Sequence, residues 1–513
     1  MKLVSVATLR ALDQAAIAAG IPADVLMERA GTAAAEWAID FCRERLHPSQ
    51  CRGWTVLAGK GNNGGDAYVA ARVLAARSKL PVTVYATDSP QSLSGAARQH
   101  ACRLPSGIPV ELCTELPAAA LRAGSVIIDG LLGTGITGTP RPPFNRIIGQ
   151  VNASGLPVIA LDLPSGMDAD TGLGDIVITA DLTVTMALPK QGLLTPAGLA
   201  RCGCLRCADL GFPPAAVAAA ASCGEAIFAE DARKWLPRRR HDAHKNVFGH
   251  LLVAGGSRRY TGAPVLAGAA GLRTGCGLVT VAVPATVRPL IHSPLNALIF
   301  RALPDGGSGQ LCAVAEDELA ELLRQVQAVV FGPGAGADAG LVPALAAILH
   351  SSLPVVVDAD GLRCLAQHPE LLKRDAATLL TPHPGELRDL LNGFGLSELR
   401  DAERLRQAAA LAARTQAVVV LKGQGTVVAA PDGRAAINTS GNSGLASAGT
   451  GDVLAGILGS LLAQGVNAWD AACLGVFVHG LAAELVPGGS RALTADDLIE
   501  HIGAAFQRLT PFA

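Results

Sequence analysis

Short apolar runs of strand length alternate with helical patterns along most of the chain. Parallel strands are joined by crossover segments that are usually helices, so this alternation predicts parallel sheets with helices on both faces. The sequence is therefore of the α/β class. In such sheets, ligands bind at the carboxyl ends of the strands. Strands are expected at residues 54–58, 81–86, 125–129, 156–162 and 182–187, and again at 250–254, 278–283, 328–331, 354–358, 378–380 and 417–421.

The length of 513 residues indicates two domains, because a single domain rarely exceeds about 250–300 residues. A Pro-rich and then Ala-rich stretch at residues 213–222 carries no motif and separates two strand–helix series. We therefore expect domains at residues 1–216 and 217–513. Helices are expected at residues 8–18, 24–46, 66–78, 93–102 and 144–151, and at 319–326, 341–350, 398–414, 453–463, 468–485 and 495–508.

Composition excludes several classes of protein. Hydrophobic residues make up 50% of the chain and charged residues 17%, which supports large cores rather than disorder. A net charge of −1 gives no general attraction to nucleic acid or anionic membranes. No apolar stretch approaches the ~20 residues of a membrane span, and Arg10 and Asp13 interrupt any signal-like core. With twelve cysteines expected as free thiols, we expect a cytoplasmic protein.

The predicted strand 54–58 runs into the sequence Gly-Lys-Gly-Asn-Asn-Gly-Gly-Asp at residues 59–66, and a helix follows. Glycines allow close approach of a ligand, and a helix N-terminus offers free N–H groups to phosphate. Asn62 and Asn63 add amide donors and acceptors for a ribose, an amide or a cation. The alternative is an ordinary turn between a strand and a helix, but the Asn-Asn-Gly-Gly-Asp run favours a binding site.

Two more strand ends carry polar, glycine-rich segments. One is Asp-Gly-Leu-Leu-Gly-Thr-Gly-Ile-Thr-Gly at residues 129–138, and the other is Asp-Leu-Pro-Ser-Gly-Met-Asp at residues 162–168. Asp162 alone has a simpler interpretation as a cap of a helix or turn. Three such strand ends at one edge of a sheet nevertheless predict a site.

The strongest motif of the second half is residues 442–452, which ends in Ala-Gly-Thr-Gly-Asp before an apolar helix. The segment from Gly449 to Gly451 is expected to direct backbone N–H groups at phosphoryl charge. The helix dipole is expected to favour the anionic form of Asp452, which then takes a proton from a substrate hydroxyl. The alternative is a capping aspartate, which does not require the small flanking residues.

Other strand ends of the second half agree with a nucleotide site. The segment Lys-Gly-Gln-Gly-Thr at residues 422–426 offers a cation and glycines for phosphate, and the Gly-rich loop at 332–336 follows another strand. His383 stands between two prolines at a strand end, where a ligand contact is favoured over a structural role. Asp358 and Asp360 are carboxylates able to order magnesium.

The three N-terminal segments together resemble the NAD(P)H-hydrate epimerase family over roughly residues 1–216. The resemblance implies a Rossmann-like three-layer domain, hydrated NADH or NADPH as substrate, and a potassium ion held by oxygen atoms of Asn63, Asp129 and Ser165. Ala67 departs from the family, which usually has glycine there. The residues implied to contact the hydrate are Asn62, Asn63, Gly64, Gly65, Asp66, Gly133, Thr134, Gly135, Ile136, Thr137, Gly138, Thr139 and Asp162.

Epimerisation at the hydroxyl carbon beside a ring nitrogen needs reversible proton transfer while the hydroxyl group leaves and returns. Asp162 is the candidate acid or base for this step. Lys190 is a weaker candidate for a second role, and the alternative is a solvated lysine after a strand.

The second half resembles ribokinase-like proteins, and more narrowly the ADP-dependent NAD(P)H-hydrate dehydratase family, over roughly residues 225–510. The segments 244–249, 255–257 and 260–263 match the opening of that family. The resemblance implies phosphorylation of the S-hydrate hydroxyl by ADP with magnesium, then loss of phosphate to give NAD(P)H and AMP. It implies hydrate contacts at Ala263, Gly336, His383 and Asp452, with Asp452 catalytic, and AMP contacts at Lys422, Gly423, Gln424, Gly425, Thr426 and Gly451.

The expected function is therefore bifunctional repair of hydrated nicotinamide dinucleotides by a homo-oligomer, without nucleic-acid or membrane partners. The main alternative is a ribokinase-like small-molecule kinase whose N-terminal domain binds ligand without catalysis. Product analysis separates them, because a kinase releases a phosphorylated substrate whereas a dehydratase releases free phosphate and reduced nicotinamide.

Overall fold

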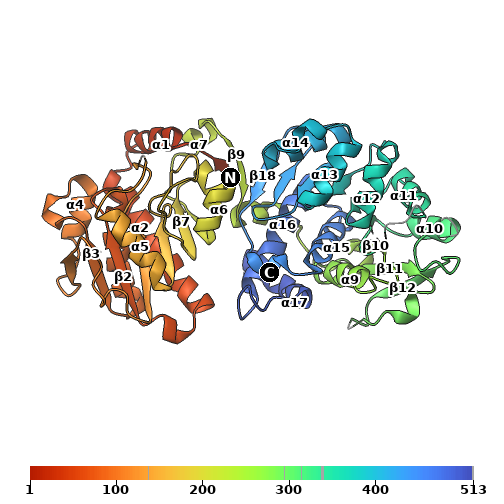
Figure 1. Ribbon diagram of the computed structural model, residues 1–513, viewed down its shortest axis with the longest axis horizontal. Coiled ribbons are helices and arrows are strands. Elements are labelled where there is room, and N and C mark those ends of the chain that lie inside the picture. The colour runs from red at the N-terminus through yellow and green to blue at the C-terminus, as the bar shows by residue number, and fades with distance from the viewer. Residues whose placement is uncertain (137, 294, 313–314, 337–339, 511–513) are drawn as a thin grey trace. The chain divides into compact units, whose positions relative to one another are not determined.

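A computed structural model describes residues 1–136, 138–293, 295–312, 315–336 and 340–510 (Figure 1). The chain divides into two compact units, Met1–Ala226 and Ile227–Ala513, called here the N-terminal and C-terminal units. The boundary expected at 216/217 lies within helix α7 (Pro214–Ala219). Thr137, one of the expected binding residues, lies outside the described residues.

The N-terminal unit contains a parallel seven-stranded sheet, as the alternation of strands and helices predicted. Its strand order is β4-β3-β2-β5-β6-β7-β8. The strands are β2 (Gly53–Ala58), β3 (Val82–Ala86), β4 (Val110–Leu112), β5 (Ser125–Gly130), β6 (Val158–Leu161), β7 (Leu182–Met186) and β8 (Cys204–Ala208).

Alternate side chains of these strands enter two different cores. Val56 and Ile128 pack into the core that includes α2 and α3, whereas Leu57 and Ile127 pack into the core that includes α5. Both faces of the sheet are therefore covered, as the period of two along a strand requires. The helices are α1 (Val6–Ala18), α2 (Ala23–Arg45), α3 (Asn62–Ser78), α4 (Gly95–Cys102), α5 (Phe144–Ser154), α6 (Pro196–Cys202) and α7. A short antiparallel pair joins β1 (Lys2–Leu3) to β9 (Gly224–Ile227).

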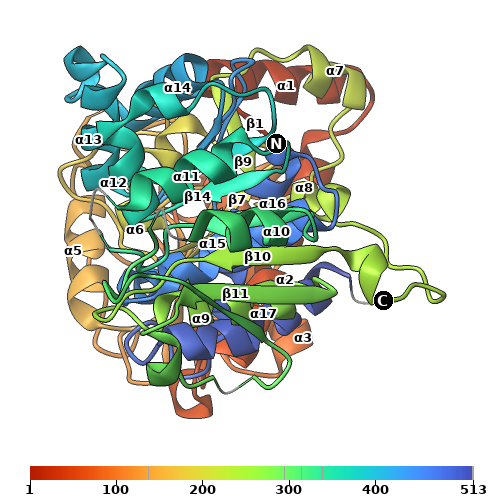
Figure 2. The same ribbon diagram turned by 90° about the vertical axis from the view of Figure 1, so that its right-hand side faces the viewer.

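The C-terminal unit holds a second sheet in the order β18-β17-β16-β15-β14-β13-β10-β11-β12. Strands β10 to β16 are parallel, and β10 and β11 run side by side in Figure 2. β17 and β18 complete one edge as antiparallel strands. The strands are β10 (His250–Ala254), β11 (Leu278–Pro284), β12 (Ile299–Leu303), β13 (Ala328–Phe331), β14 (Val355–Val357), β15 (Thr378–Leu380), β16 (Val418–Leu421), β17 (Val427–Ala429) and β18 (Ala435–Asn438).

Helices cover both faces of this sheet as well. The helix expected at 398–414 begins only at Arg404, because the Gln407 side chain bonds the carbonyls of Leu399 and Arg400 at 2.9 and 2.7 Å and stabilises a separate turn. The helices are α8 (Ala229–Trp235), α9 (Ala263–Arg273), α10 (Glu316–Leu323), α11 (Leu341–His350), α12 (Asp360–Gln367), α13 (Pro384–Gly393), α14 (Arg404–Thr415), α15 (Thr450–Ala463), α16 (Ala468–Leu485) and α17 (Ala495–Leu509).

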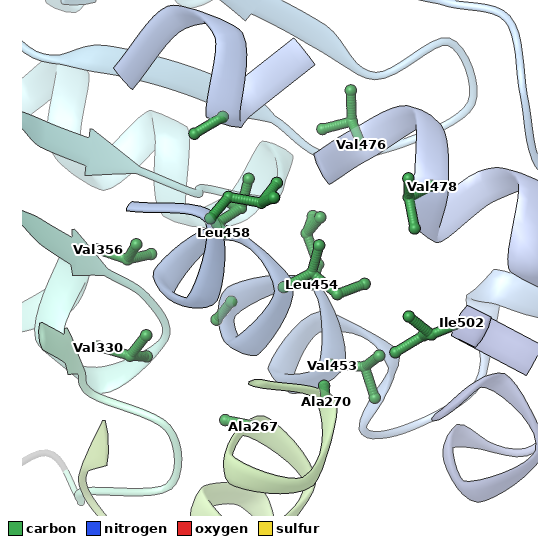
Figure 3. Close-up of a cluster of buried hydrophobic side chains, with 14 of the residues drawn as sticks. Ala267, Ala270, Val330, Val356, Val453, Leu454, Leu458, Val476, Val478 and Ile502 are labelled. Atoms are coloured by element: carbon green, nitrogen blue, oxygen red, sulfur yellow. The ribbon is translucent and has the colours of Figure 1, made fainter. Parts of the chain in front are cut away.

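Helix α15 is the central element of the C-terminal core. In Figure 3, Leu454 and Leu458 of α15 lie between the sheet residues, such as Val330, and side chains of α9, α16 and α17. Because packing fixes α15 on all sides, its first turn is held rigidly at the edge of the sheet. The neighbouring helix α16 has the length and hydropathy of a membrane span, but 83% of it is buried inside the structure, as in a core helix.

Candidate active sites

A cavity of about 820 Å³ opens in the N-terminal unit where β2, β5 and β6 end. The three motifs that the sequence singled out meet there. Gly64 and Gly65 do not line this cavity but are buried in α3, and Gly138 lines a smaller hollow of about 230 Å³ next to it. The expected residues that line the cavity are Asn62, Asn63, Asp66, Gly133, Thr134, Gly135, Ile136, Thr139 and Asp162.

The Asn-Asn-Gly-Gly-Asp run forms the first turns of α3 rather than a loop before it. The predicted start at Asp66 was wrong, since the helix begins at Asn62. A Cβ on Gly64 would stand 1.8 Å from the carbonyl oxygen of Gly59. Gly64 thus allows the helix to begin directly against the end of β2, which directs the side chains of Asn62 and Asn63 to the cavity.

Asp162 follows β6 with a φ of +65°, a left-handed conformation that is rare for residues other than glycine. Its carboxylate pairs with the ammonium group of Lys190 and accepts the Met186 N–H at 3.0 Å. Lys190 is fully buried and also donates to Thr185 Oγ1 at 3.0 Å. The solvated-lysine alternative is therefore wrong, because β7 and the turn after it enclose the side chain.

Two further carboxyl groups stand near this pair. Burial raises the pKa of Asp66 well above its ordinary value, and the charge of Asp162 raises it further. Burial also raises the pKa of Asp13, which lines the cavity from α1. Asp13 was missed from the sequence, although it occupies the same helical stripe as buried Leu9 and Leu12, an unusual place for an acidic residue.

Asn63, which lines the cavity, is linked to Ser165 and Asp129 through the carbonyl of Leu132. The Ser165 hydroxyl donates to Asp129 Oδ1 at 2.6 Å, and the Ser165 N–H donates to Oδ2 at 2.8 Å. The Asn63 amide donates to the carbonyl of Leu132 at 2.8 Å, and its buried Oδ1 has no hydrogen-bond partner. Burial raises the pKa of Asp129 to about 6, despite these hydrogen bonds.

The candidate site of the C-terminal unit is centred on the start of α15. Gly449 precedes the helix with a φ of +85°, a conformation that suits glycine. The first N–H groups of a helix have no partner inside it and are available to phosphate. A Cβ on Gly451 would stand 3.6 Å from Lys422 Nζ, so the ammonium group lies at this helix end.

Asp452 stands in the first turn of α15. Burial raises its pKa to about 7, and the negative charge of Asp358 contributes to the rise, whereas Lys422 opposes it. The sequence predicted that the helix dipole would favour the anionic form. Burial and nearby carboxylates outweigh the dipole, which leaves a carboxyl group that titrates near neutral pH.

Three carboxyl groups act on Lys422, those of Asp358, Glu386 and Asp452. Its Nζ lies 2.7 Å from Asp358 Oδ1 and 3.8 Å from Glu386 Oε2. Burial alone would lower the pKa of Lys422, but the charges of Asp358 and Glu386 raise it overall. Asp360 accepts the Gly336 N–H at 2.9 Å, so the Gly-rich loop after β13 is tied to the same cluster.

The segment 422–426 joins β16 to β17, as expected. Arg404 holds it: its guanidinium donates to the carbonyls of Gln424 at 2.5 Å and Lys422 at 3.2 Å. Arg404 was missed from the sequence. Its position at the N-terminus of α14 was a signal, because a cation is unfavourable there without another partner. The loop leaves Gly423 and Gln424 exposed.

The residues expected to contact the hydrate in this unit lie on different elements. Ala263 begins α9, and a Cβ on Gly334 would stand 3.1 Å from the Cβ of Ala263. Gly336 is held by Asp360, as described above. His383 is half exposed and caps α13, since its Nδ1 accepts the N–H groups of Gly385 and Glu386 at 2.9 and 3.2 Å.

The chain is similar to two protein families, one in each half. The family described as YjeF-related protein N-terminus matches residues 23–192, and the family described as NAD(P)H-hydrate dehydratase matches residues 251–503. Together with the two sheets, these matches confirm the expected order of a Rossmann-like domain followed by a ribokinase-like domain.

Relatives match over nearly the whole length. A protein of Coxiella burnetii named bifunctional NAD(P)H-hydrate repair enzyme Nnr is 37% identical over 96% of this chain and 97% of its own. The protein of the same name from Escherichia coli K12 is 36% identical over 95% of this chain and 90% of its own. Among solved structures, the ADP/ATP-dependent NAD(P)H-hydrate dehydratase of Bacillus subtilis, co-crystallised with ATP/Mg²⁺, is 31% identical, covers 56% of this chain and 100% of that chain, and superposes with a TM-score of 0.49.

Proposed function

The chain belongs to the family of bifunctional NAD(P)H-hydrate repair enzymes, and we propose that each unit carries one of the two reactions of that family. The N-terminal domain, residues 1–216, is an isomerase that interconverts R- and S-NAD(P)H-hydrate. The C-terminal domain, residues 217–513, is a lyase that dehydrates the S form. The observation that carries this proposal is that each unit builds its own polar site at the ends of its parallel strands.

In the N-terminal unit, we propose that the hydrated nicotinamide occupies the cavity with its hydroxyl carbon beside Asp162. The Lys190 ammonium supplies the positive charge that an ionised Asp162 needs in a buried setting. The expected residues that line the cavity contact the dinucleotide, while Gly64 and Gly65 act by allowing close packing of α3. Thr137 lies outside the described residues and stays a predicted contact.

A potassium ion fits Asn63 and the residues linked to it. Asn63 Oδ1 is buried without a partner, and Asp129, which is linked to Asn63 through Ser165 and Leu132, provides a buried negative charge, so a hard monovalent cation would satisfy both. We propose that Asn63, Asp129 and Ser165 hold it. The bound ion would fix the segment that carries Leu132 and thereby the position of the substrate loop.

In the C-terminal unit, we propose that Asp452 removes the proton of the substrate hydroxyl as its oxygen attacks the terminal phosphorus of ADP. AMP leaves, and the N–H groups at the start of α15 hold the transferred phosphoryl group. Phosphate then leaves the ring carbon while the neighbouring carbon loses a proton, which restores the ring double bond of NAD(P)H. A carboxyl group with a pKa of about 7 suits a general base at neutral pH.

The remaining contacts are proposed from the positions of the loops. AMP contacts Lys422, Gly423, Gln424, Gly425, Thr426 and Gly451, and the hydrate contacts Ala263, Gly336, His383 and Asp452. Asp358 and Asp360 each engage protein donors, so magnesium would be ordered by them through water while it neutralises nucleotide phosphate. We also propose that the protein is a cytoplasmic homo-oligomer, as expected from the sequence.

One experiment tests both activities. The purified chain is incubated with mixed R- and S-hydrate of NADH and with ADP or ATP, and the absorbance of reduced nicotinamide is followed together with free phosphate. The proposal expects complete conversion with stoichiometric phosphate. Accumulation of a phosphorylated hydrate without NADH would instead identify a kinase, and consumption of the S form alone would identify an inactive N-terminal domain.

A further inference from the structure

A second carboxyl group lies in the N-terminal cavity beside Asp162. Asp66 of α3 lines the same cavity and is 9% exposed. Among the described residues, no hydrogen-bond donor reaches its carboxyl group, whereas Asp162 accepts from Lys190 and from the Met186 N–H. The two aspartates thus share one cavity but differ in their partners.

The charges around Asp66 come from three elements. Asp13 faces it from α1, Asp162 from the end of β6, and Lys190 from the turn after β7. One buried ammonium group compensates one carboxylate, and Lys190 is paired with Asp162. An unpaired buried carboxylate next to like charges is costly and gains a proton instead. Burial and the charge of Asp162 accordingly raise the pKa of Asp66 well above its ordinary value, which favours the protonated form of this carboxyl group.

We propose that Asp66 is the general acid of the epimerase and that Asp162 is its general base. One of the two neighbouring carboxyl groups is paired with an ammonium group and the other is not, which suits the first to accept a proton and the second to give one. Lys190 is then a positioning residue that maintains the charge of Asp162. This inference rests on the proposed epimerase function of the N-terminal unit.

The reaction proceeds in two balanced steps. Asp66 gives its proton to the hydroxyl oxygen, the carbon–oxygen bond breaks with its electron pair on oxygen, and water leaves while the ring nitrogen forms a double bond to that carbon. Water then adds to the opposite face and gives a proton to Asp162. Transfer of this proton from Asp162 back to Asp66 restores the enzyme, and no other reactant is consumed.

The competing interpretation is that Asp66 only binds substrate, as the family resemblance implied. The two differ in kinetics, because loss of a binding contact raises KM, whereas loss of an acid lowers kcat. They also differ in pH dependence. An acid must keep its proton, so kcat/KM declines on the alkaline side of the optimum, and this decline disappears when Asp66 is replaced.

The test measures conversion of purified R-hydrate to the S form by the full-length chain without nucleotide, with chromatographic separation of the epimers. Asp66→Asn keeps the size of the side chain but removes the acid, so kcat is expected to fall by ~10²–10⁴-fold with little change in KM. Asp181→Asn is the matched control. Desolvation also raises the pKa of its carboxyl group, but this group accepts the Val158 N–H at 2.9 Å and does not line the cavity.

The kinetic constants and the pH profile decide whether Asp66 is the general acid. A raised KM with unchanged kcat and an unchanged alkaline decline would make Asp66 a binding residue and overturn the inference. If Asp66→Asn does not fold, the wild-type profile alone remains decisive, since a flat alkaline side excludes Asp66 as the acid. Absence of epimerisation by the wild-type chain would refute the proposed function instead.

Discussion

The rate of dehydration is predicted to rise with pH through the titration of Asp452. The pKa of this carboxyl group is raised to about 7 by burial, with a further contribution from Asp358. A general base acts only when it is ionised, so the activity is lost as pH falls below this pKa. With a midpoint of about 7, roughly a tenth of the molecules are competent at pH 6 and roughly nine tenths at pH 8, which predicts about a tenfold rise in kcat/KM.

Two substitutions test separately whether Asp452 is the base and whether Asp358 contributes to its raised pKa. Asp452→Asn is expected to lower dehydration by ~10²–10⁴-fold. Asp358→Asn removes a like charge near Asp452 and frees Lys422 to approach it, so the midpoint is expected to move to lower pH. Asp496→Asn is the control, because Asp496 also stands in the first turn of a helix, α17, but is exposed.

The assay uses purified S-hydrate with saturating ADP, so that the N-terminal activity does not limit the rate. Recovery of the absorbance of reduced nicotinamide is measured at limiting hydrate, where kcat/KM reports the groups of the enzyme that has bound ADP but not hydrate. A wild-type profile that is flat between pH 6 and pH 8, or near-normal activity of Asp452→Asn, would refute the role of Asp452. A midpoint that Asp358→Asn leaves unchanged would refute the electrostatic explanation.

Three further outcomes are expected. With mixed hydrate and saturating ADP, conversion by the Asp162→Asn variant should stop once the S form is spent, apart from the spontaneous conversion of the R form. If a chromatographic time course shows the R form cleared at the wild-type rate, Asp162 is a binding or capping residue. Potassium should raise Tm relative to a non-coordinating cation, because a potassium concentration of one hundred times Kd stabilises the folded state by about 2.7 kcal/mol. Asn63→Ala should remove most of that gain, and equal gains in both proteins would exclude Asn63 as a ligand. The fragments Met1–Ala226 and Ile227–Ala513 should each unfold cooperatively by circular dichroism, because each holds its own core, and a fragment without a cooperative transition would contradict separable domains.

The parts of the fold that the sequence predicted are those that local pattern determines. Parallel strands buried on both faces read as continuous apolar runs, and β13 and β16 are of this kind. β12 was missed because it lies at the edge of the sheet and is mostly exposed, so that polar Arg301 interrupts its pattern. The start of α3 was placed too late because glycines normally disfavour helix, and only the close contacts of Gly64 with Gly59 and of Gly65 with Met27 explain them here.

In the candidate sites too, the sequence predicted what local pattern determines and missed what contacts between distant elements determine. The sequence pointed to the strand ends that line the cavity, since glycine and aspartate after an apolar run are a local signal. It did not indicate the burial of Lys190 or the hydrogen bonds that Arg404 donates to the loop after β16, because these contacts depend on which strands become neighbours. Side-chain identity is visible in a sequence, whereas a partner supplied by another element is not.

The protonation state of a catalytic carboxyl group depends on such partners. Asp162 and Asp452 each stand at the edge of a parallel sheet, so from sequence the two aspartates are equivalent candidates for acid–base chemistry. In the structure Asp162 has a buried lysine of its own, whereas Asp452 shares Lys422 with Asp358 and Glu386. Burial raises the pKa of Asp452 to about 7, and the neighbouring carboxylates contribute to the rise because one cation divided among three carboxyl groups cannot hold all of them ionised. Strand order, which determines these neighbours, therefore sets the pH at which Asp452 can act as a base.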